Sequence, residues 1–118
     1  MDTRTSSEGA YLLVERADLP QSELEGRDFG GAEVCLIFVD AAPGEGPKLH
    51  RHAYGEIFIV LEGTPMFTIG SESLLARAGQ VLLVRAGVAH KFINTGPGIL
   101  RQVDVHLNSE FVTEWLED

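Results

Sequence analysis

Three of the four histidines of this 118-residue chain lie in two short segments, together with one glutamate. The first segment carries His50 and His52, which one residue separates, and then Glu56. The second segment carries His90. Because side chains alternate between the two faces of a strand, the pattern His-x-His places two imidazoles on one face. Imidazole and carboxylate groups bind borderline divalent metals, so these four residues are candidate ligands for one Fe, Mn, Ni, Cu or Zn ion.

The spacing of these residues resembles the two sequence motifs of the cupin superfamily. The first motif, G-x5-H-x-H-x3,4-E-x6-G, is matched at every fixed position by Gly44, His50, His52, Glu56 and Gly63. The second motif, G-x5-P-x-G-x2-H-x3-N, is matched by Gly79, Gly87, His90 and Asn94, with Arg85 in place of the proline. The resemblance to small single-domain cupins implies an all-β double-stranded β-helix, or jelly-roll barrel, that binds one divalent transition metal.

Short apolar segments between glycine-containing turns independently favour an all-β barrel or sandwich. We expect the strands near residues 11–14, 33–39, 49–52, 56–61, 65–69, 73–76, 80–84, 90–94 and 100–107. A short C-terminal helix is expected after residues 108–109, because Phe111, Val112, Trp115 and Leu116 form one helical stripe. Residues 1–9 are polar and are expected to be disordered. The whole chain, residues 1–118, is expected to form one domain with its barrel core at about residues 33–107.

Charge and composition exclude several classes of function. The formal net charge of −9 argues against nucleic acid and anionic membranes as partners, because both need a basic surface. No apolar run approaches the roughly 20 residues of a membrane span. Cys35 is the only cysteine, so no internal disulfide can form. The polar start of the chain lacks the apolar core of a signal peptide, and these features together predict a cytoplasmic protein.

Strand alternation predicts which other side chains surround the ion. If the candidate ligands point inward, Lys48, Phe58, Val60 and Phe92 point inward with them, because each lies an even number of residues from a ligand on the same segment. Tyr54 is a further pocket or core aromatic. A wall of phenylalanine and valine has a low dielectric constant and strengthens the electrostatic attraction between ion and ligands.

The roles of Arg85 and His106 stay open at this level. Arg85 either reaches the mouth of the pocket and holds a substrate carboxylate, together with Lys48, or lies exposed on the rim of the barrel, which we favour. His106 either faces the metal as an acid or base or points away from it. The apolar alternation of Val103, Val105 and Leu107 favours the outward orientation.

The resemblance implies a mononuclear-metal enzyme that acts on a small oxygenated organic molecule by dioxygenase, isomerase, cyclase or lyase chemistry, and we expect a dioxygenase-like reaction. Catalytic residues beyond the ligands cannot be assigned. The alternative is a non-catalytic module that binds or senses a metal or a small ligand and would need a separate DNA-binding partner to regulate transcription. A homodimer is expected, because the strand at Tyr11–Val14 could add to the sheet of a neighbouring copy.

Overall fold

The computed structural model describes residues 3–5 and 9–118. The described strands are β1 (Thr3–Thr5), β2 (Leu12–Val14), β3 (Glu23–Glu25), β4 (Cys35–Ala41), β5 (His50–Arg51), β6 (Glu56–Glu62), β7 (Pro65–Ile69), β8 (Glu72–Leu75), β9 (Val81–Val84), β10 (His90–Asn94), β11 (Leu100–His106) and β12 (Glu114–Trp115). Of three 3-10 turns, η1 (Arg16–Asp18) and η2 (Pro20–Ser22) precede β3, and η3 (Gly26–Asp28) lies between β3 and β4. None of the helical turns in the described residues has the length and apolar character that a membrane-spanning helix requires.

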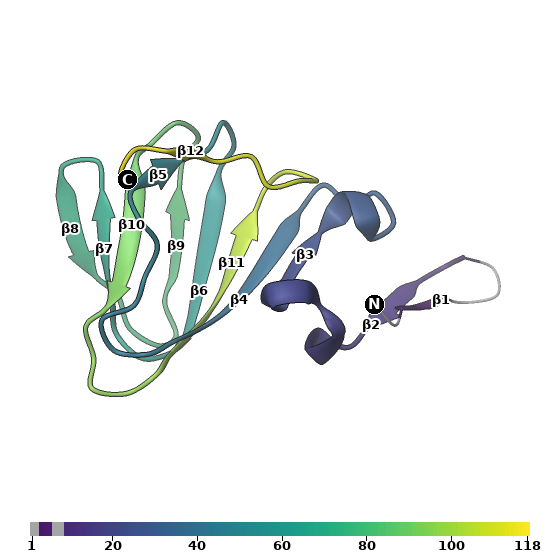
Figure 1. Ribbon diagram of the computed structural model, residues 1–118, viewed down its shortest axis with the longest axis horizontal. Coiled ribbons are helices and arrows are strands. Elements are labelled where there is room, and N and C mark those ends of the chain that lie inside the picture. The colour runs from purple at the N-terminus through teal and green to yellow at the C-terminus, as the bar shows by residue number, and fades with distance from the viewer. Residues whose placement is uncertain (1–2, 6–8) are drawn as a thin grey trace.

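Two five-stranded antiparallel sheets form the barrel (Figure 1). The strand order is β12-β5-β10-β7-β8 in one sheet and β3-β4-β11-β6-β9 in the other. From β4 to β12 the chain passes back and forth between the two sheets, and only the β7–β8 hairpin interrupts this alternation. This connectivity confirms the expected all-β jelly-roll barrel, in which both sheets turn one face toward a shared interior.

The apolar core and the candidate ligands share the same strands. Phe58 and Val60 are buried on the inner face of β6, and Glu56 begins that strand on the same face. Phe58 contacts Phe67 on β7, with 4.9 Å between the ring centroids, and Phe67 lies 5.6 Å from Phe92 on β10. Because alternation keeps every second side chain inside, each of these strands can carry apolar core residues along its length and a ligand at its end.

The N-terminal hairpin lies apart from the barrel (Figure 1). The expected strand at residues 11–14 is present as β2, and it pairs with β1 of the same chain. Of the expected disordered segment, residues 1–2 and 6–8 lie outside the described residues, whereas Thr3–Thr5 form β1. Tyr11 and Leu13 are exposed, so the hairpin presents apolar side chains that the barrel of its own chain does not cover.

The expected C-terminal helix is wrong. Residues 108–118 run extended across one end of the barrel, and β12 pairs with β5 (Figure 1). The backbone N–H of Leu116 donates to the carbonyl of Leu49 at 2.9 Å. Phe111, Thr113 and Trp115 alternate onto the face that covers the interior. Pairing with a sheet edge and closing the barrel stabilise the extended form, and this tertiary context outweighs the helical stripe.

Candidate metal centre

The structure brings the four candidate ligands together at one end of the barrel. His50 begins β5 and lies opposite His90, the first residue of β10, in the register of one sheet. Glu56 enters from β6 in the facing sheet, and His52 follows β5. All four side chains are buried, and one ligand atom from each lies within 4.8 Å of the others.

The turn that delivers His90 forms without the motif proline. Gly87 has a φ of 80°, a left-handed conformation that glycine adopts without steric cost. Its N–H donates to the carbonyl of His52 at 2.7 Å, and the N–H of Val88 donates to the carbonyl of Arg85 at 3.3 Å. These backbone hydrogen bonds fix the turn and join it to the segment that carries another candidate ligand.

Backbone carbonyls set the orientation of the three candidate histidine ligands. Each Nδ1 atom lies 2.6–2.9 Å from a carbonyl oxygen, which is that of Lys48 for His50, Val112 for His52 and Val88 for His90. A carbonyl oxygen only accepts hydrogen bonds, so each Nδ1 carries the proton. The lone pair of each Nε2 is therefore available to a metal, in the arrangement usual for metal-binding histidines.

The contacts of Glu56 show that the donor set fits a cation. Its Oε1 lies 3.0 Å from the Nε2 of His90 and 3.2 Å from the Nε2 of His52. The His52 Nε2 is buried and forms no well-directed hydrogen bond, although it lies within ion-pair distance of Oε1. With the protons on Nδ1, these contacts bring lone pairs against a carboxylate oxygen. A divalent cation among these atoms would satisfy all of them.

Burial and hydrogen bonding set the charges at this centre. Burial alone would raise the pKa of Glu56, but the contacts of its carboxylate with the imidazoles of His106, His52 and His90 outweigh burial and hold that pKa well below its usual range. Burial lowers the pKa of His50, which keeps its imidazole neutral. Burial also disfavours the charged form of His90, but Glu56 and a backbone carbonyl reverse this effect and raise its pKa. An ionised carboxylate and neutral imidazoles are the forms that bind metals.

The fourth histidine, His106, supports the other oxygen of Glu56. Its Nε2 lies 3.1 Å from Oε2, and its Nδ1 lies 2.8 Å from the hydroxyl of Tyr54. Burial raises the pKa of Tyr54 to about 12, so the hydroxyl stays protonated and donates to Nδ1. The Tyr54 oxygen in turn accepts from the N–H of Val112 at 3.3 Å. A chain of hydrogen bonds from the C-terminal segment therefore orients the candidate carboxylate ligand.

The outward orientation expected for His106 is wrong. Its side chain is only 3% exposed and faces the interior together with Gln102 and Asp104, whereas Val103 and Val105 face the other side of the sheet. The predicted alternation of polar and apolar side chains along β11 is present, but the valines face outward and the polar residues face the interior, which is the reverse of the expectation. Near the ligands the interior is polar, and the valines cover the outer face of the sheet, so hydrophobicity alone did not identify the inside.

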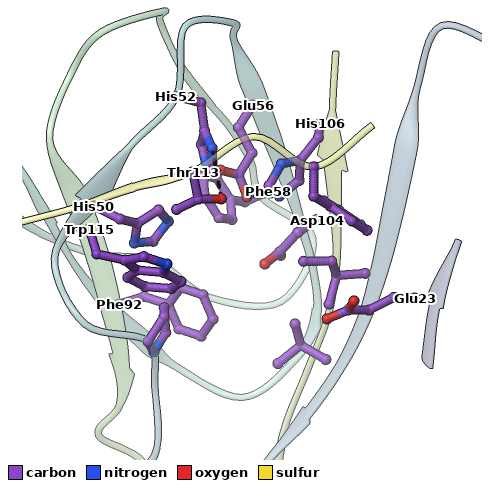
Figure 2. Close-up of a pocket in the computed structure, with 14 residues that line it drawn as sticks. Glu23, His50, His52, Glu56, Phe58, Phe92, Asp104, His106, Thr113 and Trp115 are labelled. Carbon is purple, nitrogen blue, oxygen red and sulfur yellow. Dashed lines mark hydrogen bonds and ion pairs between the residues drawn. The ribbon is translucent and has the colours of Figure 1, made fainter. Parts of the chain in front are cut away.

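A cavity of about 400 Å³ opens beside the candidate ligands (Figure 2). Of the side chains expected to surround the ion, Phe58, Phe92 and His106 line this cavity. Tyr54 instead stacks on His52 at 4.8 Å between ring centroids, and Val60 is buried in the apolar core.

The two basic residues expected near the pocket do not line this cavity. Lys48 lines a different hollow, together with Lys91 and Glu117, because β5 begins at His50 and strand alternation does not extend back to residue 48. Arg85 is exposed.

Several lining residues were not among those expected from the sequence. They are Glu23, Ile37, Val39, Pro47, Asp104, Phe111, Thr113 and Trp115. The alternation of Phe111, Thr113 and Trp115 was a signal for an extended segment. Asp104 lies two residues before His106 on the same face of β11, so the correct orientation of one would have located the other.

Comparison with known proteins relates this site to a family. The family model described as Cupin domain matches residues 37–106. The HTH-type transcriptional regulator PuuR of Escherichia coli K12 is 34% identical over 80 residues, which cover 66% of this chain and 43% of the regulator. The chain therefore spans less than half of the regulator's length. The uncharacterized protein SCO3923 of Streptomyces coelicolor is 33% identical over 89 residues, which cover 75% of this chain and 71% of that protein.

Solved structures with a similar fold include two oxalate decarboxylases. The Bacillus subtilis enzyme, a protein with Mn(II) centres, superposes with a TM-score of 0.73 at 19% identity, over 80% of this chain and 27% of that chain. The Lactobacillus farciminis enzyme, in a formate complex, gives a TM-score of 0.73 at 19% identity, over 80% of this chain and 30% of that chain. At this identity the similarity concerns the fold alone.

Proposed function

The chain belongs to the cupin family, and on this premise we propose that it is a metal-dependent enzyme acting on a small oxygenated organic molecule. The main support for this proposal is that the cluster of four candidate ligands borders a cavity of about 400 Å³. Three histidines and one glutamate would hold the ion, and any position that these ligands leave open would be available to water or substrate. A cavity of this volume lies within the range that admits a small ligand.

Different residues have different roles at the proposed site. His50, His52, Glu56 and His90 would hold one divalent Mn, Fe, Ni, Cu or Zn ion. When bound, the ion supplies Lewis acidity and, for a redox-active metal, dioxygen activation, and we place the reaction in the dioxygenase-like class. His106 orients Glu56 through the hydrogen bonds described above. The aromatic walls exclude water from the space next to the ligands.

A second candidate function is a ligand-sensing module, which the similarity to the regulator PuuR favours. In this alternative the same cavity binds a small molecule without turnover, and a partner protein contacts DNA. The matched region covers 43% of the regulator, so the comparison concerns only part of that protein.

A second copy of the chain is the proposed macromolecular partner. Eight apolar side chains form two in-register rows on the outer face of the β3-β4-β11-β6-β9 sheet, namely Phe38, Val103, Ile59 and Val81 in one row and Leu36, Val105, Ile57 and Leu83 in the other. A contiguous apolar patch on the surface of a soluble protein often marks a site of protein–protein contact. A two-fold dimer would cover the same face on both copies.

Metal analysis of the purified protein tests the metal site. We expect about one transition-metal ion per chain, and most of it should be lost in His52→Ala or His90→Ala, since each removes one of four ligands. The fold should survive in both variants because the buried apolar cluster does not include the ligands. Protein that cannot be loaded above trace levels with any of the five metals would overturn the proposal.

Ligand titrations separate the enzyme from the sensor. Chelating enols or catechols should change the spectrum of Mn- or Cu-loaded protein, because an open position on the ion accepts their oxygens. Turnover that is lost in Glu56→Ala and kept in Glu62→Ala, an exposed control on the same strand, would support the enzyme. Saturable binding without turnover would support the sensor. A fully loaded protein that responds to no chelator would contradict both.

A further inference from the structure

The cavity has a second polar end, opposite the candidate metal centre. Glu23 on β3 and Asp104 on β11 both pair with Ile37 on β4, so the two carboxylates belong to one cross-strand row on the inner face. Neighbouring strands lie about 4.8 Å apart, which places the Cα atoms of the two acids roughly 10 Å from each other. Figure 2 shows both carboxylates turned into the cavity, across from His50 and Trp115.

No lysine or arginine accompanies these carboxylates. Neither residue type lines the cavity, and among the described residues neither forms an ion pair with Glu23 or Asp104. Asp104 is 4% exposed and accepts a hydrogen bond at 2.8 Å from the neutral amide of Gln102, whose own Oε1 is buried without a partner. Burial raises the pKa of Asp104 well above its usual range. The pKa of Glu23 is also raised, mainly by burial and to a smaller degree by the negative charge of Glu25. The ionised forms of both acids therefore have no lysine or arginine beside them, and the effect of His106, which lowers the pKa of Glu23, is smaller than that of burial.

The rest of the cavity also favours positive charge. Aromatic rings of Phe58, Phe92, Phe111 and Trp115 line it, and the faces of such rings attract cations. At the metal end, the Nε2 of His52 is buried without a hydrogen-bond partner. Two carboxylates at one end of the cavity and the candidate metal ligands at the other indicate a ligand with a cationic group at one end and metal-binding atoms at the other.

We propose that the ligand of this cavity carries a cationic amine at one end and metal-chelating oxygen atoms at the other. The amine lies between Glu23 and Asp104, and the oxygen atoms face the cluster of histidines and Glu56. This assignment rests on the metal-dependent function proposed above and adds its substrate class. It leaves no place for the alternative considered from the sequence, in which Arg85 and Lys48 hold a substrate carboxylate, because neither residue lines the cavity.

Three hydroxamates of similar length test the assignment on zinc-loaded protein. They are 3-aminopropanohydroxamate, butanohydroxamate and the monohydroxamate of succinic acid, which place an ammonium, a methyl or a carboxylate group opposite the same chelating group. Trp115 is the only tryptophan of the chain and lines the cavity, so its fluorescence reports binding. We expect the ammonium probe to bind about tenfold or more tightly than the methyl probe, and the carboxylate probe to bind most weakly.

Two isosteric variants locate the amine. Glu23→Gln and Asp104→Asn should each reduce the preference for the ammonium probe to within about threefold and leave the affinity of butanohydroxamate unchanged. Glu72→Gln, an exposed control on β8, should keep the full preference. Circular dichroism verifies that each variant is folded.

The outcomes separate this inference from the function on which it rests. If butanohydroxamate binds as tightly as the ammonium probe, or if both variants keep the preference, the amine assignment is wrong and the metal-dependent function stands. If none of the three probes binds the zinc-loaded protein, the metal-dependent function fails and the amine assignment fails with it.

Discussion

Two carboxylates on the inner face of the barrel differ in charge because their neighbours differ. Burial by itself acts to raise the pKa of both Glu56 and Asp104. Three imidazoles contact Glu56, and they outweigh the effect of burial on its pKa and keep the carboxylate ionised. Asp104 receives only the amide of Gln102, which is too weak to offset burial and the nearby charge of Glu56. The first carboxylate is therefore suited to hold a cation permanently, and the second to respond to the charge of a bound ligand.

The raised pKa of Asp104 predicts the pH dependence of stability. A group whose pKa is higher in the folded state than its unfolded value of 3.8 contributes fully to stability below that value, and the contribution is lost as pH rises toward the folded pKa. Asp104→Asn removes this loss, so we expect the variant to melt at a higher temperature than the wild type at neutral pH, which lies above the unfolded pKa. The difference should shrink as pH falls toward the unfolded pKa. A gain of ~1 kcal/mol would shift the melting temperature by about 4–8 °C.

Scanning calorimetry of both proteins across pH measures this difference. The exposed residue Asp28 provides the control, since Asp28→Asn should leave the melting temperature unchanged at each pH. A melting temperature of Asp104→Asn that is equal to or below that of the wild type at neutral pH would contradict the prediction.

At the scale of elements, the C-terminal segment, residues 108–118, is part of the site. Glu114 holds Arg51 through two contacts of 2.7 and 3.0 Å, and Glu117 contacts Lys91 at 3.1 Å. Exposed ion pairs of this kind contribute little to stability, so the backbone pairing of β12 with β5 carries most of the attachment. Once attached, the segment places the carbonyl of Val112 against His52 and covers the cavity.

Truncation after Ser109 tests this role. The truncated protein loses the carbonyl that orients His52, and we expect its metal affinity to fall about 10–100-fold. The barrel should stay folded, because the buried apolar cluster lies between Ala41 and Leu100. Competition with a chromophoric chelator measures the affinity, and circular dichroism monitors the fold.

Deletion of residues 1–9 is the matched control for this truncation. It removes nine residues from the other end of the chain, and none of those that the structure describes lines the cavity, so the metal affinity should not change. Full metal affinity in the C-terminal truncation would show that the segment only covers the cavity.

At the scale of the whole molecule, two exposed apolar features have no partner within the described chain. One is the outer face of the β3-β4-β11-β6-β9 sheet, where Val81 is 66% and Leu83 is 49% exposed. The other is the β1–β2 hairpin, which lies apart from the barrel (Figure 1). The net charge of −9 opposes association, so a dimer must bury enough apolar surface to overcome this repulsion. The outer face of the sheet offers that surface.

Size-exclusion chromatography with light scattering tests the dimer. The wild type should elute with twice the mass of the chain at micromolar concentration, and the double variant Val81→Lys/Leu83→Lys should elute as a monomer, because two buried lysines per subunit cannot be paired. Leu75→Lys, on the exposed β8 of the other sheet, should stay dimeric. Deletion of residues 1–16 shows whether the hairpin adds to the interface. A monomeric wild type would overturn the proposed dimer.

The sequence by itself determined the barrel and the group of candidate ligands. The barrel follows from local rules, because turn glycines such as Gly87 and the two-residue period of strands are encoded by neighbouring residues. The resemblance of the segments at His50–Glu56 and at His90 to the two cupin motifs predicted that distant strands bring these side chains together, and the structure places them at one point.

Only the tertiary structure decided which face of β11 is the interior and which segment closes the barrel. Alternation determines that His106 and Asp104 share a face of β11. It does not determine which face is the interior, because polar side chains occupy one face and valines the other. The orientation of the strand depends on its pairing with β4 and β6. The path of Trp115 depends on pairing with His50, 65 residues earlier in the chain. The position of Glu23 in the cavity likewise requires β3 to pair with β4. Such long-range contacts leave no local pattern, and they give the cavity its acidic end and its cover.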